Sequence, residues 1–300
     1  MSFSEEAIRW KKKGISLSLG KSRLTVFYRS LGNIYAQPDK TLLIIHGFPE
    51  SSFSFHKVIG ELEQKFDRIV LFDFLGFGLS DKPRKGFNYS ILAHAGTAEM
   101  LWRAVSVQGG HLLCHDMGTS VGTELLYRQS LGTLKCFKAF QTVTFTNGSM
   151  AIEFSKLRVA QKILLNKTVG PYFSKLINKT IVNHQIKSAH GNNKLSQSDI
   201  DDLWYFMKEN NGIDISHLLI QYYRDRVKYE RSRWLPCLQH LKIPIHLCWG
   251  VDDQVAPEAM VNYLHKNICP QAKLSLIKDA GHFAHIGSPH AWTKAILAFY

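Results

Sequence analysis

The chain has 300 residues, of which 45% are hydrophobic and 20% charged, a composition typical of a folded globular protein rather than a disordered one. Lysine and arginine exceed aspartate and glutamate by 37 to 24, which gives a net charge of +13. No zinc-finger spacing or aromatic RNA-binding signature accompanies this charge, and the longest basic run is Lys11-Lys12-Lys13. We therefore expect no nucleic-acid partner.

The cysteine pattern and the apolar runs bear on the compartment. There are five cysteines, and no two are spaced as Cys-x-x-Cys, which argues against a disulfide framework and against a zinc site of that type. The first residues include no apolar segment of the secretory kind, and no apolar run reaches the ~20 residues of a membrane span. We expect a cytoplasmic protein whose membrane contact, through the basic segment at residues 10–13, is at most peripheral.

Short segments rich in Val, Ile, Leu or Phe alternate with segments of helical length. Residues 15–19 and 24–28 predict an antiparallel hairpin at a sheet edge, with its turn at 20–22. Further strands are predicted at Thr41–Ile45, Arg68–Phe72, His111–Cys114, Phe137–Phe145, Ile243–Trp249 and Lys273–Ile277. Helices are predicted at Ile91–Val105, Thr119–Tyr127 and Ala259–Asn267. This alternation predicts crossover units and a parallel sheet with helices on both faces.

Residues 150–235 interrupt the alternation. This segment is polar and helical in pattern, and Ser196 to Asp199 precede an Ile/Leu/Trp run as a helix start does. The strand pattern returns at Ile243. The simplest organisation is one α/β core formed by residues 1–149 and 236–300, with a helical cap at 150–235 inserted into it.

The segment 111–122 predicts a strand, a tight turn and a helix. It contains the pattern G-x-S-x-G centred on Ser120, which is typical of serine esterases. A nucleophile elbow, however, follows its strand directly and needs small residues two before, two after and three after the nucleophile. Asp116 meets this requirement with the residues Cys114, Gly118 and Thr119. We favour Asp116 as the nucleophile and expect Ser120 in the first helical turn, with a serine-type esterase as the alternative.

An aspartate nucleophile implies a particular chemistry. A carboxylate attacks an electrophilic carbon, such as that of an epoxide or alkyl halide, without a base to activate it, and it forms an ester. A second step must hydrolyse this ester, which requires an activated water and an oxyanion hole.

The remaining catalytic candidates follow later strands. His282, in the loop after the last predicted strand, is the candidate base, and His285 is its competitor. Asp253, after the preceding strand, is the candidate that orients the imidazole, whereas Asp252 is expected to be a solvated loop acid. The chain order Asp116, Asp253, His282 is nucleophile, acid, histidine.

The oxyanion hole is expected between two loops. His46-Gly-Phe-Pro49 follows the strand at residues 41–45, and the N–H groups of Phe48 and Met117 are the expected donors. Pro49 is expected to follow a cis peptide bond.

Together these motifs resemble the α/β-hydrolase superfamily, in the branch of epoxide hydrolases and haloalkane dehalogenases. The resemblance is carried by His46-Gly-Phe-Pro49, His115-Asp-Met-Gly118, Gly250-x-x-Asp253 and Gly281-His282-Phe283. It implies an α/β-hydrolase fold with a mostly parallel, eight-strand-type sheet flanked by helices and an inserted helical cap. It implies no metal and no organic cofactor. Peripheral association with the endoplasmic reticulum and a monomeric or dimeric state stay open.

The resemblance also separates two reactions. Dehalogenases hold the leaving halide with a Trp directly after the nucleophile and an Asn or Trp in the oxyanion loop, where this chain has Met117 and Phe48. Epoxide hydrolases share His-Gly-Phe-Pro and use cap tyrosines to protonate the epoxide oxygen. The segment 221–224, Gln-Tyr-Tyr-Arg, resembles their cap motif Asn-Trp-Tyr-Arg and puts Tyr223 in the position of the acid. Tyr172 and Tyr205 are candidates for a second tyrosine.

The sequence therefore predicts a hydrolase that opens small apolar or lipid-like epoxides to diols through an ester of Asp116. The alternatives are a serine-type esterase or lipase that uses Ser120, a haloalkane dehalogenase, and a non-catalytic hydrolase-like protein that binds a lipid or a partner.

Overall fold

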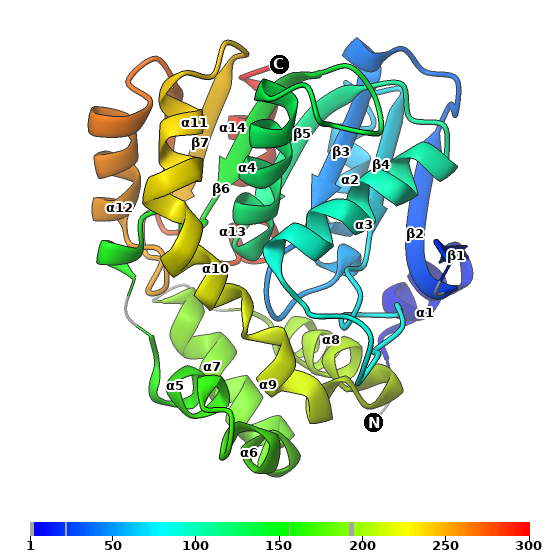
Figure 1. Ribbon diagram of the computed structural model, residues 1–300, viewed down its shortest axis with the longest axis vertical. Coiled ribbons are helices and arrows are strands. Elements are labelled where there is room, and N and C mark those ends of the chain that lie inside the picture. Colours follow the sequence, from blue (N-terminus) through cyan, green and yellow to red (C-terminus); the bar gives the residue numbers. More distant parts are fainter. Residues whose placement is uncertain (1–2, 22, 156, 192–194) are drawn as a thin grey trace.

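The computed structural model describes residues 3–21, 23–155, 157–191 and 195–300 (Figure 1). Its centre is one eight-stranded sheet with the order β1-β2-β4-β3-β5-β6-β7-β8. The strands are β1 (Ile15–Leu19), β2 (Leu24–Gly32), β3 (Thr41–Ile45), β4 (Arg68–Phe72), β5 (Gly110–His115), β6 (Phe140–Thr146), β7 (Ile245–Gly250) and β8 (Lys273–Ile277). The predicted α/β-hydrolase fold with a mostly parallel sheet is confirmed.

The sheet is antiparallel at one edge and parallel elsewhere. β1 pairs with β2, and β2 with β4, in antiparallel fashion, and all other pairs are parallel. The predicted edge hairpin is therefore confirmed, although Ser22 of its turn lies outside the described residues. Every residue of β3, β4 and β7 is buried, as expected for strands covered on both faces.

Some predicted bounds are wrong. β2 continues past Tyr28 because it stays paired with β4 as far as Gly32 opposite Arg68. β6 begins at Phe140 rather than at Phe137, and β7 begins at Ile245 rather than at Ile243, directly after Pro244. A proline has no N–H to donate to a strand ladder, which fits a strand that begins just beyond it.

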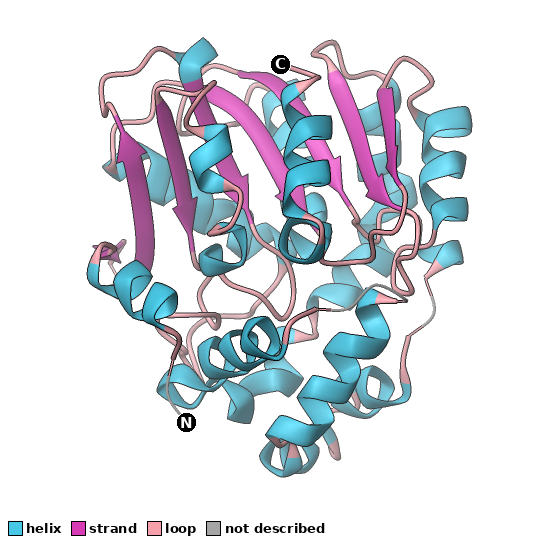
Figure 2. Ribbon diagram, turned by 180° about the vertical axis from the view of Figure 1, so that it is seen from behind, coloured by secondary structure: helices cyan, strands magenta, loops and turns pink. Residues whose placement is uncertain are grey.

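Helices cover both faces of the sheet. One face carries α3 (Ile91–Ala104), α4 (Met117–Ser130), α11 (Leu235–Gln239) and α12 (Glu258–Tyr263), in front in Figure 1. The other face carries α2 (Ile59–Leu62) and α14 (Pro289–Leu297). It is in front in Figure 2, which views the molecule from the opposite side. The short α13 (Ala284–Gly287) precedes α14, and α1 (Glu5–Lys12) packs beside β2 through Trp10, which lies against Arg29.

The segment predicted as the cap lies at the carboxyl ends of the parallel strands, at the bottom of Figure 1. Between β6 and β7 its described residues form helices and no strand. The helices are α5 (Val159–Leu165), α6 (Gly170–Leu176), α7 (Lys179–His190), α8 (Gln197–Lys208), α9 (Ser216–Leu219) and α10 (Tyr222–Tyr229). The predicted helix start at Ser196 is confirmed, since its hydroxyl accepts from the N–H of Asp199. α10 continues through a wider turn at 230–234 into α11, so the connection back to the core is helical.

None of the helices in the described part of the chain has both the length and the apolarity that crossing a membrane requires.

Candidate active site

Asp116 occupies the turn between β5 and α4. β5 ends at His115 and α4 begins at Met117, so the turn consists of Asp116 alone, with φ +45° and ψ −113°. A non-glycine residue with positive φ is strained, and such strain is found at functional turns. A Cβ at Gly118 would lie 2.6 Å from the carbonyl oxygen of His46, so only glycine fits there. These features are those of the elbow that the sequence predicts.

One carboxylate oxygen of Asp116 lies in the predicted oxyanion hole. The N–H of Phe48 donates to Asp116 Oδ2 at 2.8 Å. Met117 is the first residue of α4, where helix N–H groups have no partner within the helix. The bond between Phe48 and Pro49 is cis, as predicted. The loop after β3 thus supplies one donor to this oxygen, and Met117 as the second donor stays a prediction.

His282 and Asp253 form the second part of the site. His282 Nδ1 lies 2.8 Å from Asp253 Oδ2, and both side chains are buried. Asp253 Oδ1 accepts from the N–H groups of Val255 and Ala256, and its Oδ2 accepts from Asn147 Nδ2. Four hydrogen bonds therefore hold the carboxylate against one edge of the imidazole, which fixes the ring and leaves Nε2 directed at the nucleophile.

His282 Nε2 lies 3.9 Å from Asp116 Oδ1, so the base and the nucleophile face each other without a hydrogen bond. Burial lowers the pKa of His282, but the adjacent charges of Asp253 and Asp116 outweigh it and raise the pKa to about 9. The imidazole therefore keeps its proton at neutral pH.

The competing candidates lie elsewhere. Ser120 is in the first turn of α4, as expected, and its hydroxyl accepts from Arg226 Nε at 2.9 Å. His285 is buried behind the elbow, 2.9 Å from Glu50. Asp252 is half-buried and does not line the cavity. Among the described residues, the structure brings together Asp116, Asp253 and His282, and keeps Ser120 apart from His282.

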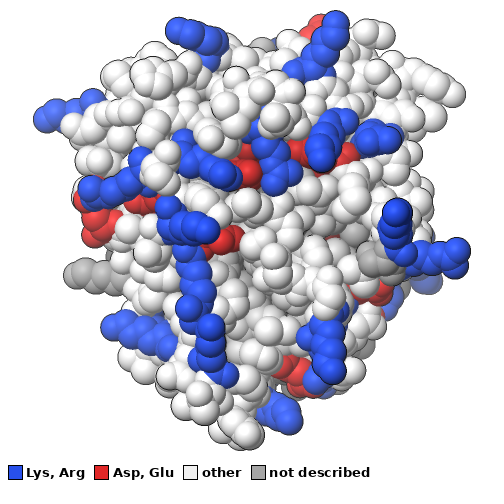
Figure 3. Space-filling model, in the orientation of Figure 1, with Lys and Arg blue, Asp and Glu red and all other residues white. Residues whose placement is uncertain are grey.

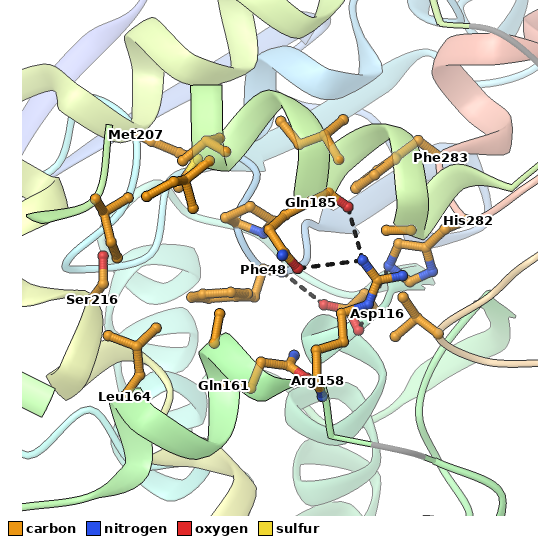
Figure 4. A pocket seen from close by; sticks show the side chains of 18 of the residues that line it. Phe48, Asp116, Arg158, Gln161, Leu164, Gln185, Met207, Ser216, His282 and Phe283 are labelled. Atoms are coloured by element: carbon orange, nitrogen blue, oxygen red, sulfur yellow. Dashed lines mark hydrogen bonds and ion pairs between the residues drawn. The ribbon is translucent and has the colours of Figure 1, made fainter. Parts of the chain in front are cut away.

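A cavity of about 110 Å³ lies between this site and the cap (Figure 4). Asp116 and His282 form its floor with Phe48, and α5, α6 and α7 supply most of its walls. The apolar wall residues include Leu164, Phe173, Ile177, Val182, Ile186, Met207 and Phe283. The site is thus suited to a small apolar group.

The cap tyrosines divide clearly. Tyr222 lines the cavity and is buried, and its ring contacts that of Phe48 at 5.9 Å between centroids. Tyr223, the predicted acid, packs beside it without lining the cavity, Tyr172 is exposed, and Tyr205 lies against Phe3. Burial, and after it the charge of Asp116, raise the pKa of Tyr222, so its phenol keeps its proton. Of the two adjacent tyrosines, Tyr222 rather than Tyr223 is therefore placed to contact a ligand in the cavity.

Arg226, one turn after Tyr222 on α10, is a residue that the sequence pattern did not indicate. It is buried, and its Nη2 lies 3.9 Å from Asp116 Oδ1 and 3.4 Å from the Asp116 carbonyl oxygen. Its guanidinium also lies over the ring of Tyr222. Arg226 is four residues after Tyr222, which puts both side chains on one helix face. This spacing is the feature of the sequence that could have indicated Arg226.

Glu50, His115 and His285 form a buried cluster behind the elbow, with atoms within 4.8 Å of one another that could ligate a metal. Glu50 Oε1 is 2.9 Å from His285 Nε2, and Glu50 Oε2 accepts from the N–H of Gly47. Burial lowers the pKa of His115 to about 3 and that of His285 well below its usual range. Hydrogen bonds satisfy only part of this cluster: among the described residues, His115 Nε2, 3.3 Å from Glu50 Oε2, and His285 Nδ1 have no hydrogen-bond partner. Through Glu50 the cluster links the loop after β3 to the residues behind the elbow.

Residues 40–289 match the profile of a family described as alpha/beta hydrolase fold. The chain belongs to the α/β-hydrolase family. It is 30% identical over 295 residues to the human mesoderm-specific transcript homolog protein, covering 97% of this chain and 86% of that protein. It is 34% identical over 262 residues to the putative hydrolase LipZ of Mycobacterium tuberculosis (strain H37Rv), covering 86% and 87%.

Solved structures show the same fold. A haloalkane dehalogenase variant from Bradyrhizobium elkanii superposes with a TM-score of 0.76 at 15% identity, covering 95% of both chains. An esterase from Exiguobacterium antarcticum gives 0.71 at 14%, covering 95% of this chain and 98% of that one. At such identities the likeness shows the fold alone and selects no reaction.

Proposed function

We propose that the protein opens epoxides by way of an ester on Asp116. The observation that carries this proposal is the position of the Asp116 carboxylate, with Oδ2 held by the Phe48 N–H at 2.8 Å and Oδ1 on the side of His282. One oxygen is thus held where negative charge must later be stabilised, and the other is left to attack.

In the first step Asp116 Oδ1 attacks an epoxide carbon, and the carbon–oxygen bond of the ring breaks. The electron pair goes to the epoxide oxygen, which takes the phenolic proton of Tyr222, the tyrosine in the cavity wall. A neutral phenol beside the developing alkoxide is a suitable general acid. Tyr222 thereby takes the role that the sequence pattern gave to Tyr223.

In the second step a water attacks the carbonyl carbon of the ester. His282 Nε2 takes its proton, and the charge that forms on Asp116 Oδ2 is held by the N–H groups of Phe48 and Met117. The bond between Cγ and Oδ1 of Asp116 then breaks. The leaving Oδ1 takes the proton held by His282 and departs as part of the diol, and the acid formed at Asp116 returns its proton to the Tyr222 phenolate, which restores the carboxylate and the phenol. Esterification removes the charge of Asp116, one of the groups that raise the pKa of His282, so the imidazole gives up its proton more readily when a base is needed.

The other reactions have weaker support. Ser120 has its hydroxyl bound to Arg226 and lines a different, smaller cavity. At the two positions where dehalogenases hold the halide, Met117 and Phe48 supply no side-chain N–H. A non-catalytic role does not require an imidazole oriented toward Asp116, so it does not explain the hydrogen bonds that orient His282.

The test is to trap the ester. His282→Gln removes the base of the second step but leaves Asp116 in place, so incubation with styrene oxide should add the mass of the substrate to the peptide that contains Asp116. Asp116→Asn should give no adduct. An adduct on Ser120 with a nitrophenyl ester, or no adduct with either reagent, would overturn the proposal.

A further inference from the structure

The wall of the cavity carries one cation apart from His282. Among the described residues that line it, Arg158 is the only lysine or arginine. It comes from the residue before α5, and Figure 4 shows its side chain extending along the cavity toward Gln185. Arg158 Nη1 donates to the carbonyl oxygen of Gln185 at 2.9 Å, and it lies 3.4 Å from Gln185 Oε1.

These contacts use one nitrogen of a group that has three. A guanidinium has five N–H donors in a planar fork that fits a carboxylate through two parallel hydrogen bonds. Both bonds of Arg158 go to neutral oxygens of Gln185, and it forms no ion pair within the ranges that the structure describes, although the charge of Asp253 acts on it from farther away. Such a cation in an apolar cavity is suited to an anion brought by the ligand.

We propose that the cavity binds monocarboxylates with a short hydrocarbon chain, the carboxylate on Arg158 and the chain along the apolar wall. This rests on the proposed function in one respect: the substrate is then an epoxide that also carries a carboxylate.

Hexanoate and 1-hexanol make a matched pair of unreactive probes for calorimetry. The wild type should bind hexanoate more tightly, and Arg158→Gln should weaken hexanoate about tenfold or more while 1-hexanol is unchanged. Arg103→Gln on α3, an exposed arginine, is the control. Equal losses for both probes would reduce Arg158 to a support of α5, and equal wild-type affinities would also overturn the proposal. Because neither probe reacts, failure of the epoxide chemistry would show separately, as no diol formed despite hexanoate binding.

A second, independent observation concerns the outer surface of the cap. From residue 154 to residue 198 the sequence has no aspartate or glutamate but eight lysines and arginines. Lys162, Lys167, Lys175 and Lys187 are exposed there. Figure 3 shows Lys and Arg side chains distributed over this end of the molecule. The segment 154–198 therefore presents only positive charge to an anion, although Figure 3 shows acidic side chains elsewhere at this end of the molecule.

The same surface exposes apolar side chains. Val169, Tyr172 and Leu176 have 50%, 71% and 68% of their surface exposed, and they are spaced i, i+3 and i+7, on one face of α6. Val159, at the start of α5, is 74% exposed. Apolar side chains between lysines are the composition by which helices bind the interface of an anionic membrane.

We propose that α5 and α6 dock on an anionic lipid membrane, with these apolar side chains inserted among the headgroups. The opposite faces of the same two helices line the cavity through Leu164 and Phe173. A docked protein would therefore hold its cavity one helix away from the lipid.

Vesicle co-sedimentation tests this surface. The protein should bind phosphatidylcholine vesicles with about 30% phosphatidylserine, and binding should fall in about 500 mM salt. Tyr172→Ser with Leu176→Ser, and separately Lys167→Glu with Lys175→Glu, should each weaken binding about tenfold.

Two double variants serve as controls. Ile34→Ser with Tyr35→Ser removes exposed apolar side chains elsewhere, and Lys135→Glu with Lys138→Glu makes the same charge change before β6, at the other end of the sheet. Both should bind as the wild type does. Equal losses in the controls, no binding at all, or binding to polyglutamate but not to vesicles would overturn the proposal; the last would assign the surface to an acidic protein.

Discussion

The core and the cap contribute to the same cavity but differ in how their residues are positioned. Asp116, Asp253 and His282 come from loops at the carboxyl ends of β5, β7 and β8, where the sheet sets the backbone. Tyr222 comes from α10 and Arg158 from the residue before α5, in the cap, where side-chain direction depends on how each helix is turned and packed. Strand ends therefore position the proposed nucleophile and base, whereas the packing of the cap positions the proposed acid and the cation of the cavity wall.

Some of the hydrogen bonds between the two regions are buried beside the catalytic groups. Glu124 on α4 accepts from Arg233 and from the indole of Trp234, which follow α10. His190 at the end of α7 accepts from the N–H of Phe283, next to His282. The cap thus contacts the elbow helix on one side and the histidine loop on the other, so a change in the cap can reach the catalytic groups.

The largest expected effect tests the core. Asp116→Asn removes the attacking oxygen, and we expect epoxide turnover to fall by about 10³-fold or more, as loss of a nucleophile does. Ser120→Ala, in the first turn of the following helix α4, is the comparison and should keep activity within about threefold, since Ser120 only accepts a hydrogen bond from Arg226. Diol formation from styrene oxide measures both. The opposite ranking of the two variants would move the nucleophile to Ser120.

A second prediction concerns the charge of His282. Its pKa is about 9 in the folded protein and about 6.5 in the unfolded chain. The folded state holds this proton more tightly than the unfolded chain does, so the charged imidazole stabilises the fold. This contribution to the free energy of unfolding is complete below pH 6.5 and disappears as pH rises through 9, a change of about 3 kcal/mol. Urea unfolding from pH 6 to pH 10 should show this loss for the wild type.

In the same series, the free energy of unfolding of His282→Gln should not show this decrease between pH 6 and pH 10, whereas His290→Gln, which changes an exposed histidine, should follow the wild type. Identical curves for all three proteins would mean that His282 does not carry the charge that its contacts with Asp253 and Asp116 imply.

The sequence was sufficient for the core because the turn at Asp116 demands particular residues. Gly118 must lack a Cβ to pass the carbonyl of His46, and such a steric demand is visible in the sequence. The bounds of β6 and β7 were missed by two or three residues because pairing with neighbours, not composition, ends a strand.

The cap was harder to predict for the opposite reason. Adjacent tyrosines 222 and 223 differ by about 100° around their helix, and only tertiary packing decides which one faces the cavity. Arg226 and Glu50 were missed as well, because a buried charge cannot be told from a solvated one until its partners are known.

The third prediction tests the cap in these terms. Tyr222→Phe removes the phenolic proton without changing the shape of the cavity, and we expect kcat for an epoxide to fall by about 10²-fold. Tyr223→Phe should change it by less than about threefold, since Tyr223 does not line the cavity. Steady-state kinetics on styrene oxide distinguishes them, and a larger loss in Tyr223→Phe would return the role of acid to that residue.

The smallest expected effect tests how tightly the backbone fixes the elbow. Gly118→Ala would place a Cβ 2.6 Å from one backbone oxygen and 2.7 Å from another, so the strand end or α4 must shift at a cost of about 1–3 kcal/mol. Gly60→Ala on α2 meets nothing within 4 Å and should be neutral or slightly stabilising. Thermal unfolding compares the two. If Gly118→Ala were as stable as Gly60→Ala, small movements would relieve the crowding behind Asp116, and the view that strand ends position the core site would have to rest on the hydrogen bonds of Asp116, Asp253 and His282 alone.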